Sequence, residues 1–328
     1  MGAGVGQDSR ADLHVHSNAS DGTDSPAQVI RRAARAGLDA VALTDHDTVA
    51  GHPQARRALA GDLMLVPGLE LSCQLQGRSV HLLAYLFDPD DDELAAELAR
   101  IRDDRVLRAR AMVDRLVELG VDVSWDQLAA IAGPAVIGRP HIARAMVASG
   151  AIAEPREAFT ADWIADGGRA YVSRYALDPV RAIRLVRGAG GATVLAHPRA
   201  GREGEMTDEQ IAGLAAVGLA GVEVFHPDHT DSERTRLRAL AADLGLLASG
   251  GSDDHGGLTG NRIGCETAAD GVCAALISMT SGARVMRRSL NQWVLFLGLT
   301  WPRRWGGCGK KGGESGPRGR NRSDERTD

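Results

Sequence analysis

The sequence predicts an α/β protein whose strands close into a barrel-like sheet, interrupted by a helical insertion. Three observations support this prediction. Short apolar runs alternate with helical segments in both halves of the chain, the region between them has helical spacing throughout, and His, Asp and Glu residues recur beside the apolar runs. Repeated strand–helix units favour parallel strands with helices outside. In such barrels the carboxyl ends of the strands carry the chemistry.

Seven segments have the length and apolar composition of strands. They are residues 11–15, 39–44, 63–71, 79–87, 192–196, 221–225 and 247–249. Gly77 lies between the third and fourth segments and predicts a hairpin. The fourth strand is therefore expected to run antiparallel to its neighbour, whereas the others are expected to be parallel.

Helical segments separate most of these strands. They are residues 25–36, 48–60, 179–187, 209–216 and 232–244. The first begins with Ser25 and Pro26, a favourable N-cap and first-turn pair, and stops at Gly37. Repeated strand–helix units of this kind, with six or seven strands in one chain, suggest a closed, barrel-like sheet.

The alternation of strand and helix segments stops after Pro89, where an acidic run marks a boundary. From Leu94 onward, apolar residues recur at helical spacing. The expected organisation is a first barrel part, a helical insertion, a second barrel part and an extension of undefined fold. These parts are residues 10–94, 95–170, 171–267 and 268–328. From about residue 302 the extension is basic and Gly-rich, which is typical of a disordered tail.

The composition narrows the function classes. The chain has 328 residues, of which 44% are hydrophobic but only 4% aromatic, so its core must consist mainly of Ala, Leu and Val. The net charge of -5 disfavours non-specific nucleic-acid binding over the whole surface. The four cysteines form no CxxC pair, and the sequence predicts no signal peptide and no membrane span. We therefore expect a cytoplasmic protein with no membrane contact and no obligate protein partner.

Nine potential metal ligands lie within or just after the strand-like runs. They are His14, His16, Asp21, His46, Glu70, His81, His197, Asp253 and His255. His14 and His16 share one face of a strand because strand side chains alternate. Glu70 closes an apolar run, where a carboxylate without a partner is costly. Imidazole and carboxylate ligands without thiolate suit Mn, Fe or Zn.

Taken singly, several of these residues have ordinary structural roles as alternatives. Asp21 precedes a glycine and could simply form a turn, and His81 could be a structural histidine in a strand. Asp45 and Asp47 flank His46 and are expected to support that imidazole or cap the next helix. The presence of nine such potential ligands at the ends of apolar runs favours a shared metal centre.

Six segments resemble the motifs of the PHP (polymerase and histidinol phosphatase) metal-dependent phosphoesterases, over about residues 10–265. These segments are Asp12-Leu13-His14-Val15-His16-Ser17, Ser20-Asp21-Gly22, Leu43-Thr44-Asp45-His46-Asp47, Pro67-Gly68-Leu69-Glu70, Ala196-His197-Pro198 and Gly251-Ser252-Asp253-Asp254-His255. The resemblance implies a distorted, TIM-like barrel of seven strands with three divalent metal ions. Mn is the expected metal, with Fe, Zn and Mg as alternatives.

The resemblance also implies a role for each candidate residue. The first ion would be held by His14, His16, Glu70 and Asp253; the second by Glu70, His81 and His197; the third by Asp21, His46 and His255. Glu70 and Asp253 are thus the expected catalytic carboxylates. Arg139 and His141 of the insertion are expected to bind substrate phosphates. The acid that protonates the leaving alcohol is either a metal-bound water or His229, and His226 is a secondary candidate for the pocket wall.

Within this family, the helical insertion and the segment from Gly138 to Ala143 are similar to enzymes that act on nucleoside 3',5'-bisphosphates and on 5' ends of short RNA. The expected substrate is therefore a small nucleotide or a short oligoribonucleotide. Two alternatives stay open. One is a small-molecule phosphatase of the histidinol-phosphate type, and the other is a non-catalytic PHP module that binds partners.

Overall fold

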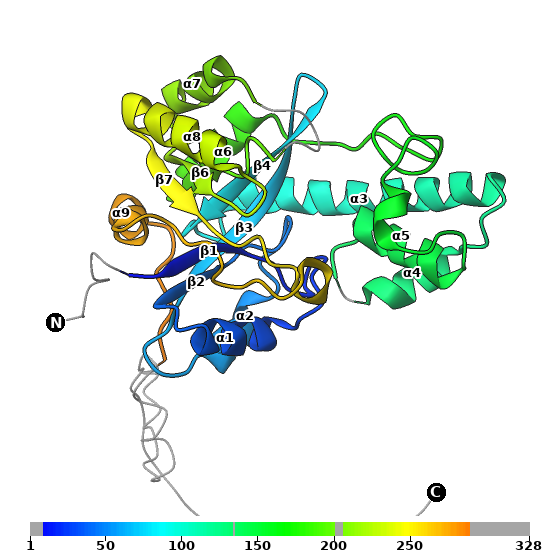
Figure 1. Cartoon of the computed structure of the whole chain (residues 1–328), viewed down its shortest axis with the longest axis horizontal. Coiled ribbons are helices and arrows are strands. Elements are labelled where there is room, and N and C mark those ends of the chain that lie inside the picture. Colours follow the sequence, from blue (N-terminus) through cyan, green and yellow to red (C-terminus); the bar gives the residue numbers. More distant parts are fainter. Residues whose placement is uncertain (1–8, 134, 201–205, 289–328) are drawn as a thin grey trace, which may run out of the picture. The chain divides into compact units, whose positions relative to one another are not determined.

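The computed structural model describes residues 9–133, 135–200 and 206–288, and its centre is a seven-stranded sheet (Figure 1). The strands follow the chain in the order β1 to β7. They are β1 (Ala11–Val15), β2 (Ala40–Leu43), β3 (Met64–Leu75), β4 (Arg78–Tyr85), β5 (Ala192–Leu195), β6 (Gly221–Phe225) and β7 (Leu247–Gly250). All seven expected strands are present. β3 is longer than expected because its far end pairs with β4 as far as Leu75 opposite Arg78.

The pairing of the strands is mostly parallel, and the sheet nearly closes into a barrel. β4 alone runs antiparallel, to both β3 and β5, which confirms the expected return strand. The first and last strands approach each other at their carboxyl ends, where Val15 forms an isolated bridge with Asp254. The backbone N–H of His16 donates to the carbonyl of Asp254 over 2.9 Å. This closure brings the loops after β1 and β7 together.

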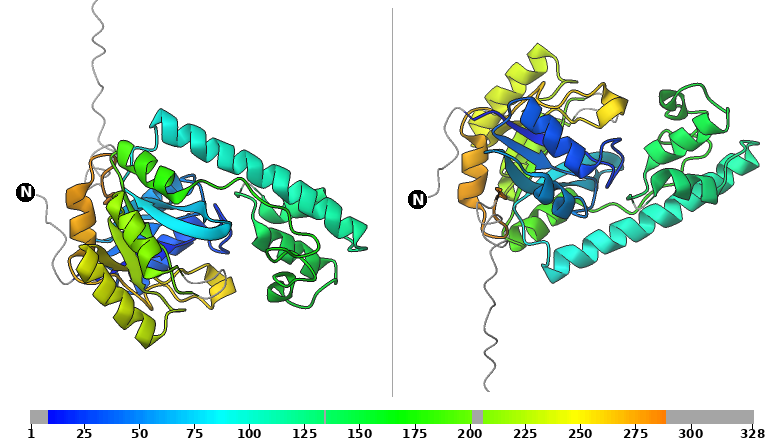
Figure 2. Two further views of the ribbon diagram at one scale, coloured as in Figure 1. Left: turned by 90° about the horizontal axis from the view of Figure 1, so that it is seen from above. Right: turned by 90° about the horizontal axis from the view of Figure 1, so that it is seen from below.

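Helices cover the outside of the sheet (Figure 2). They are α1 (Pro26–Arg35), α2 (His52–Ala58), α6 (Pro179–Gly188), α7 (Asp208–Ala216), α8 (Asp231–Leu244) and α9 (Val272–Met279), with the short η2 (Gly256–Thr259) in the loop after β7. Side chains that accept from the first-turn backbone cap most of them, as Ser25 does for α1 and Thr230 for α8. α9 lies within residues 268–328, the extension for which the sequence predicts no defined fold. It buries Val272 and Leu276 in the same apolar cluster as Tyr85 of β4.

Between β4 and α6 the described residues form the helices α3 (Asp92–Glu118), α4 (Trp125–Ala132), α5 (Arg139–Ala148) and η1 (Pro155–Ala158). The first three turns of α3 belong to the barrel, because Leu94 and Ile101 pack in the core formed by the strands. From Ala109 onward the helices enclose a separate core that includes Leu116 and Met146. The insertion therefore has its own apolar centre, which explains how it can project from one side of the barrel (Figure 2).

Polar contacts fix the insertion beside the carboxyl ends of the strands. The guanidinium of Arg105 on α3 donates to the carboxylate of Asp47 over 2.8 Å and to the hydroxyl of Ser72 over 2.6 Å. The backbone N–H of Val136 donates to the carbonyl of Ala19 over 3.1 Å. In the part of the chain that the structure describes, no helix is both long and apolar enough to cross a membrane. The basic tail expected from about residue 302 lies outside the described residues.

Candidate metal centre

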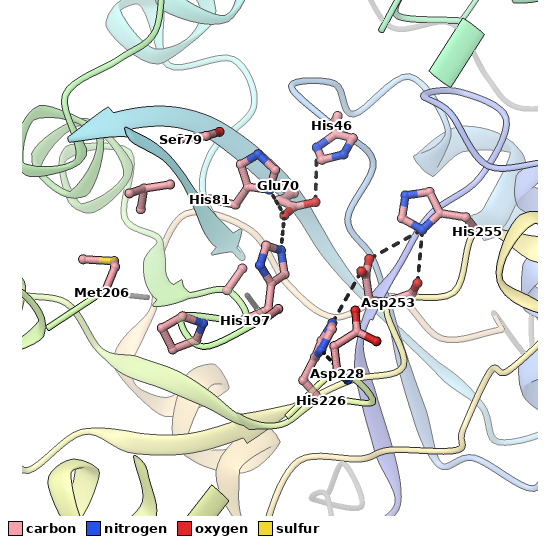
Figure 3. Close-up of a pocket in the computed structure, with 14 residues that line it drawn as sticks. His46, Glu70, Ser79, His81, His197, Met206, His226, Asp228, Asp253 and His255 are labelled. Atoms are coloured by element: carbon pink, nitrogen blue, oxygen red, sulfur yellow. Dashed lines mark hydrogen bonds and ion pairs between the residues drawn. The ribbon is translucent and has the colours of Figure 1, made fainter. Parts of the chain in front are cut away.

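The nine predicted ligands converge at one rim of the sheet. His14 and His16 come from the end of β1, Glu70 from β3 and His81 from β4. The other five lie on loops that follow strands, and they are Asp21, His46, His197, Asp253 and His255. All nine are buried or nearly so. Six of them, Glu70 among them, line one cavity (Figure 3).

Glu70 lies at the centre, and its two carboxylate oxygens face different imidazoles. Oε1 lies 2.7 Å from Nδ1 of His81 and 3.1 Å from Nε2 of His197. Oε2 lies 3.0 Å from Nε2 of His16 and 3.1 Å from Nδ1 of His46. A carboxylate that presents its oxygens to two separate imidazole pairs has the geometry of a bridging ligand.

The ligand atoms form four overlapping groups, and within each group the atoms lie within 4.8 Å of one another. These groups are His16, Asp21, His46 and His255; His14, His16 and Asp253; His14, Glu70 and His197; and His46, Glu70 and His81. Glu70 belongs to two groups, as does each of three histidines. The donors therefore form one connected cluster that could hold several ions.

Several donor atoms in this cluster lack a hydrogen-bond partner among the described residues, although they are buried. They are Nδ1 of His16, Oδ1 of Asp21, Nδ1 of His46 and Oδ1 of Asp253. Buried polar atoms are almost always satisfied, because an unsatisfied one costs free energy. Divalent cations at this rim would satisfy them, and six imidazoles with three carboxylates form a donor set that fits first-row divalent metals. The residues present thus fit metal binding.

The charges in the cluster are strongly coupled. Burial disfavours a charged imidazole, but the neighbouring carboxylates, led by Glu223, outweigh burial and raise the pKa of His14 well above its usual value. For His16, burial is likewise outweighed by Asp253 and Glu70, and its pKa rises to about 10. At His46 burial prevails and lowers the pKa to about 3. A site whose carboxylates hold protons on two buried imidazoles attracts positive charge, which is the electrostatic requirement for binding cations.

The backbone is locally strained where it presents two of the ligands. His197 has a φ of 26° and Asp253 a φ of 48°, both in the left-handed region that side chains rarely adopt. Such strain persists where the surrounding structure fixes the position, and it clusters at functional sites. Gly251 is required for a different reason, since a Cβ atom there would lie 2.5 Å from the backbone nitrogen of His14.

Two buried carboxylates support the ligands, and our sequence analysis missed both. Oε1 of Glu223 lies 3.1 Å from Nδ1 of His14, and Oε2 accepts from the backbone N–H of His197 over 2.7 Å. Asp12 accepts from the backbone of Ser252 and other residues, while burial raises its pKa to about 6. Glu223 interrupts an apolar strand, the same signal that identified Glu70, so the sequence did contain the information.

The aspartates next to the ligands have structural partners. Asp45 accepts from the backbone N–H of Ser17 over 2.8 Å and from the hydroxyl of Ser20 over 2.7 Å, which shapes the loop that carries Asp21. Asp254 is fully buried and binds Arg32 over 2.8 Å, outside the ligand cluster. These contacts hold the ligand loops in place.

The residues predicted to act on the substrate fall into two groups. Arg139 lines a large groove beside the metal centre, where it donates to Asp166 over 2.7 Å. His141 is only 1% exposed, and its Nδ1 accepts from the backbone N–H of Gly138 over 3.1 Å. His141 therefore caps the start of α5, and the prediction that it binds phosphate needs correction, because its buried side chain lines neither cavity.

His229 also needs correction as the acid for the leaving alcohol. It is 4% exposed, its Nδ1 lies 3.0 Å from the carbonyl of Val224, and its Nε2 accepts from the backbone N–H of Arg199 over 3.3 Å. Both ring nitrogens are engaged by the backbone, and His229 does not line the cavity, so its ring presents no proton to a substrate there. His226 lines the cavity instead (Figure 3). Its Nδ1 accepts from the backbone of Asp228 over 3.1 Å, which places the proton of a neutral ring on Nε2, 3.4 Å from Asp253.

Two cavities meet at the centre. The smaller, about 220 Å³, is lined by ligand side chains together with His226 and Asp228. The larger, about 1410 Å³, shares Asp228, Asp253 and His255 with it and extends towards the insertion. A buried polyhistidine cluster that opens into a wide, arginine-containing groove defines the class of protein as a metal-dependent enzyme acting on anionic substrates.

Comparisons with known proteins identify the family. The PHP domain matches residues 12–118. The chain is 35% identical to the 3',5'-nucleoside bisphosphate phosphatase of Chromobacterium violaceum, over 76% of this chain and 89% of that protein. It is 33% identical to a 5'-3' exoribonuclease of Haemophilus influenzae, over 74% of this chain and 89% of that protein. It is 32% identical to a phosphoribosyl 1,2-cyclic phosphate 1,2-diphosphodiesterase of Eggerthella lenta, over 75% of this chain and 94% of that protein.

Solved structures agree with this assignment. A Bifidobacterium adolescentis protein described as a metal-dependent phosphoesterase has a TM-score of 0.76 at 34% identity, covering 83% of this chain and 96% of that one. An amidohydrolase of Chromobacterium violaceum has a TM-score of 0.75 at 32% identity, covering 86% and 99%. The chain belongs to the PHP family and is a metal-dependent phosphoesterase.

Proposed function

We propose that this enzyme cleaves the bond between phosphorus and O3' of a nucleotide that carries a 5'-phosphate. Its substrates would be nucleoside 3',5'-bisphosphates and the 5' ends of short RNA. The observation that carries the proposal is the position of the Glu70 cluster at the end of a wide groove that contains Arg139. The two activities named for the Chromobacterium and Haemophilus relatives support it.

One reaction accounts for both substrates. In each case water adds to the phosphorus attached to O3', the P–O3' bond breaks, and a proton passes to the departing O3'. With a bisphosphate the other product is inorganic phosphate. With RNA the other product is the remaining chain, which keeps that phosphate at its new 5' end. The site must therefore hold the same terminal nucleotide in both reactions, and only the group beyond the phosphorus differs.

The nine clustered donors would hold up to three divalent ions, with His14, His16, Glu70 and Asp253 on the first, Glu70, His81 and His197 on the second, and Asp21, His46 and His255 on the third. Such ions neutralise phosphate charge and lower the pKa of bound water. Mn is the metal we favour, with Fe, Zn or Mg as alternatives. Glu70 and Asp253 keep this cluster together, because each contacts at least two of its imidazoles.

Two further residues act directly on the substrate in this proposal. Arg139 binds a phosphate group, since its planar guanidinium can donate two parallel hydrogen bonds. His226 donates a hydrogen bond from Nε2 to the departing O3', and the proton that O3' takes up comes from water. This assignment follows from the Nδ1 contact with the Asp228 backbone, which leaves the proton on the nitrogen beside the cavity. Three cysteines in the described residues carry free thiols, which suits the reducing cytoplasm as the location of the reaction.

The alternatives are less well supported. A phosphatase for a molecule as small as histidinol phosphate has no need of a groove of about 1410 Å³ beside the metal centre. A non-catalytic PHP module is expected to have lost ligands, yet all nine are present and lie in one cluster.

The proposal is tested by measuring phosphate release from adenosine 3',5'-bisphosphate with added manganese, with histidinol phosphate as the comparison substrate. The wild type should hydrolyse the bisphosphate, and His14→Ala should lose nearly all activity because its imidazole touches two carboxylates of the cluster. Activity on histidinol phosphate without activity on the bisphosphate would favour the small-molecule phosphatase over the proposed nucleotide phosphoesterase. Turnover of neither ester by metal-loaded protein would support the binding module.

A further inference from the structure

The large groove extends well beyond the metal centre. On one side it is lined by Arg139, Arg144 and Phe159 of the insertion, and on the other by Leu258, Thr259 and Arg262 after β7. Its volume of about 1410 Å³ exceeds the range of roughly 300–1000 Å³ that is typical of pockets for a single small molecule. A nucleoside bisphosphate bound at the Glu70 cluster would leave much of this groove unused.

Arg144 gives the groove an unused positive charge. Arg139 and Arg156 have carboxylate partners in Asp166 and Glu154. Arg144, by contrast, has no hydrogen bond or ion pair with any residue in the described part of the chain, and its Nε is buried without a partner. A guanidinium that is half-buried and unpaired is unfavourable unless an anion binds it. Its position in the groove makes a substrate phosphate the natural partner.

The same groove has exposed apolar side chains. Phe159 is 41% exposed and Leu258 is 42% exposed, and both are among the few large hydrophobic residues at the described surface. The Arg139 guanidinium lies 5.8 Å from the centre of the Phe159 ring, so a phosphate-binding group and an aromatic surface are adjacent. Alternating arginines and aromatic rings are the pattern by which proteins hold single-stranded nucleic acid, because any base can stack on an aromatic ring.

We propose that this groove binds the nucleotides that follow the cleaved bond in a single-stranded RNA. A base stacks on Phe159 against the apolar wall that Leu258 provides, and Arg144 binds a phosphate of the RNA backbone. The inference rests on the proposed function, since the groove receives this part of the RNA only if the terminal nucleotide lies at the Glu70 cluster. It adds that the enzyme prefers an oligonucleotide to a bisphosphate.

The direct test is binding without catalysis. A 5'-phosphorylated pentaribonucleotide, labelled at its 3' end and carrying a non-hydrolysable methylenephosphonate in place of its first linkage, is titrated with manganese-loaded full-length protein, and binding is followed by fluorescence anisotropy. Phe159→Ala should weaken binding about fivefold or more, which is the lower end of the range for loss of a stacked base. Phe159→Trp should keep the affinity. Arg144→Gln should weaken binding and reduce its dependence on salt concentration. Met279→Ala, which truncates an exposed apolar residue of α9, is the matched control.

A kinetic comparison separates this inference from the proposed function. In manganese, the ratio of kcat/KM for a 5'-phosphorylated trinucleotide to kcat/KM for adenosine 3',5'-bisphosphate should fall at least fivefold in Phe159→Ala and in Arg144→Gln. A ratio equal to that of the wild type in both variants, with unchanged RNA binding, overturns the inference even if both substrates are hydrolysed. Failure of the wild type to hydrolyse either substrate refutes the proposed function instead, whereas the binding measurement still decides the role of the groove.

Discussion

Replacing Glu70 by Gln is the most informative single change in this enzyme. The substitution keeps the size and shape of the side chain but removes its charge and turns one oxygen into an amide nitrogen. Each Glu70 oxygen lies within 3.3 Å of at least two imidazole nitrogens. The variant thus keeps the packing of β3 and removes the one group that faces both halves of the donor cluster.

The size of the effect follows from electrostatics. Two unit charges about 4 Å apart interact by about 4 kcal/mol at an effective dielectric constant of 20. Because about 1.4 kcal/mol corresponds to a tenfold change in an equilibrium constant, losing one carboxylate charge should weaken binding of an adjacent cation about a thousandfold. Glu70 faces two positions, so we expect the variant to bind fewer ions and to lose at least 99.9% of its phosphoesterase activity, or about a thousandfold, at limiting manganese.

The assay combines isothermal titration with manganese and phosphate release from adenosine 3',5'-bisphosphate. The matched control is Glu97→Gln, which also removes the charge of a buried glutamate, one that binds Arg181 and Tyr175 on the outside of the barrel. The control should keep both metal binding and activity. If Glu70→Gln retained activity within tenfold of the wild type across the manganese titration, Glu70 would not bridge two ions and the proposed arrangement would be wrong.

Three further predictions follow from the same structure. Glu223→Gln should lower manganese affinity about 10- to 100-fold in a titration, because Glu223 orients both His14 and the backbone of His197; unchanged affinity would deny it that role. Adding EDTA should lower the melting temperature by several degrees, since a hundredfold excess of a ligand over its Kd stabilises the fold by about 3 kcal/mol, and an unchanged temperature would mean that no ion stabilises the fold. Burial lowers the pKa of His141 to about 4, so the folded state takes up its proton later than the unfolded state as the pH falls, and stability is lost below about pH 6.5. Urea denaturation in EDTA should show that His141→Asn loses about 2 kcal/mol less than the wild type between pH 7 and pH 5, and equal losses would contradict this.

Much of the barrel could be predicted because its sequence signals are local. β1 and β6 begin and end where apolar runs do, and the ends of α1 are fixed by Ser25 with Pro26 and by Gly37. α9 could not be predicted in the same way. It is apolar on all faces and preceded by Gly271, which provides no side-chain cap, so neither helical periodicity nor a start signal distinguishes it. Its position depends on the apolar surface of the completed barrel.

In the candidate site, too, the sequence predicts some features and not others. The ligand positions could be predicted because charged or imidazole side chains at the ends of buried strands are costly without partners. The roles of His141 and His229 could not be predicted, because a histidine that accepts from a backbone N–H has no sequence signature that distinguishes it from a histidine facing a substrate. Only the folded chain shows that Gly138 and Arg199 supply those N–H groups.

The central claim is that the nine donors around Glu70 hold a cluster of cations, and anomalous X-ray scattering tests it most directly. Crystals of manganese-loaded protein, measured at the manganese absorption edge, should give three peaks inside the donor cluster, with Glu70 in contact with two of them. Absence of any peak among these side chains, or peaks only elsewhere on the protein, would contradict the account.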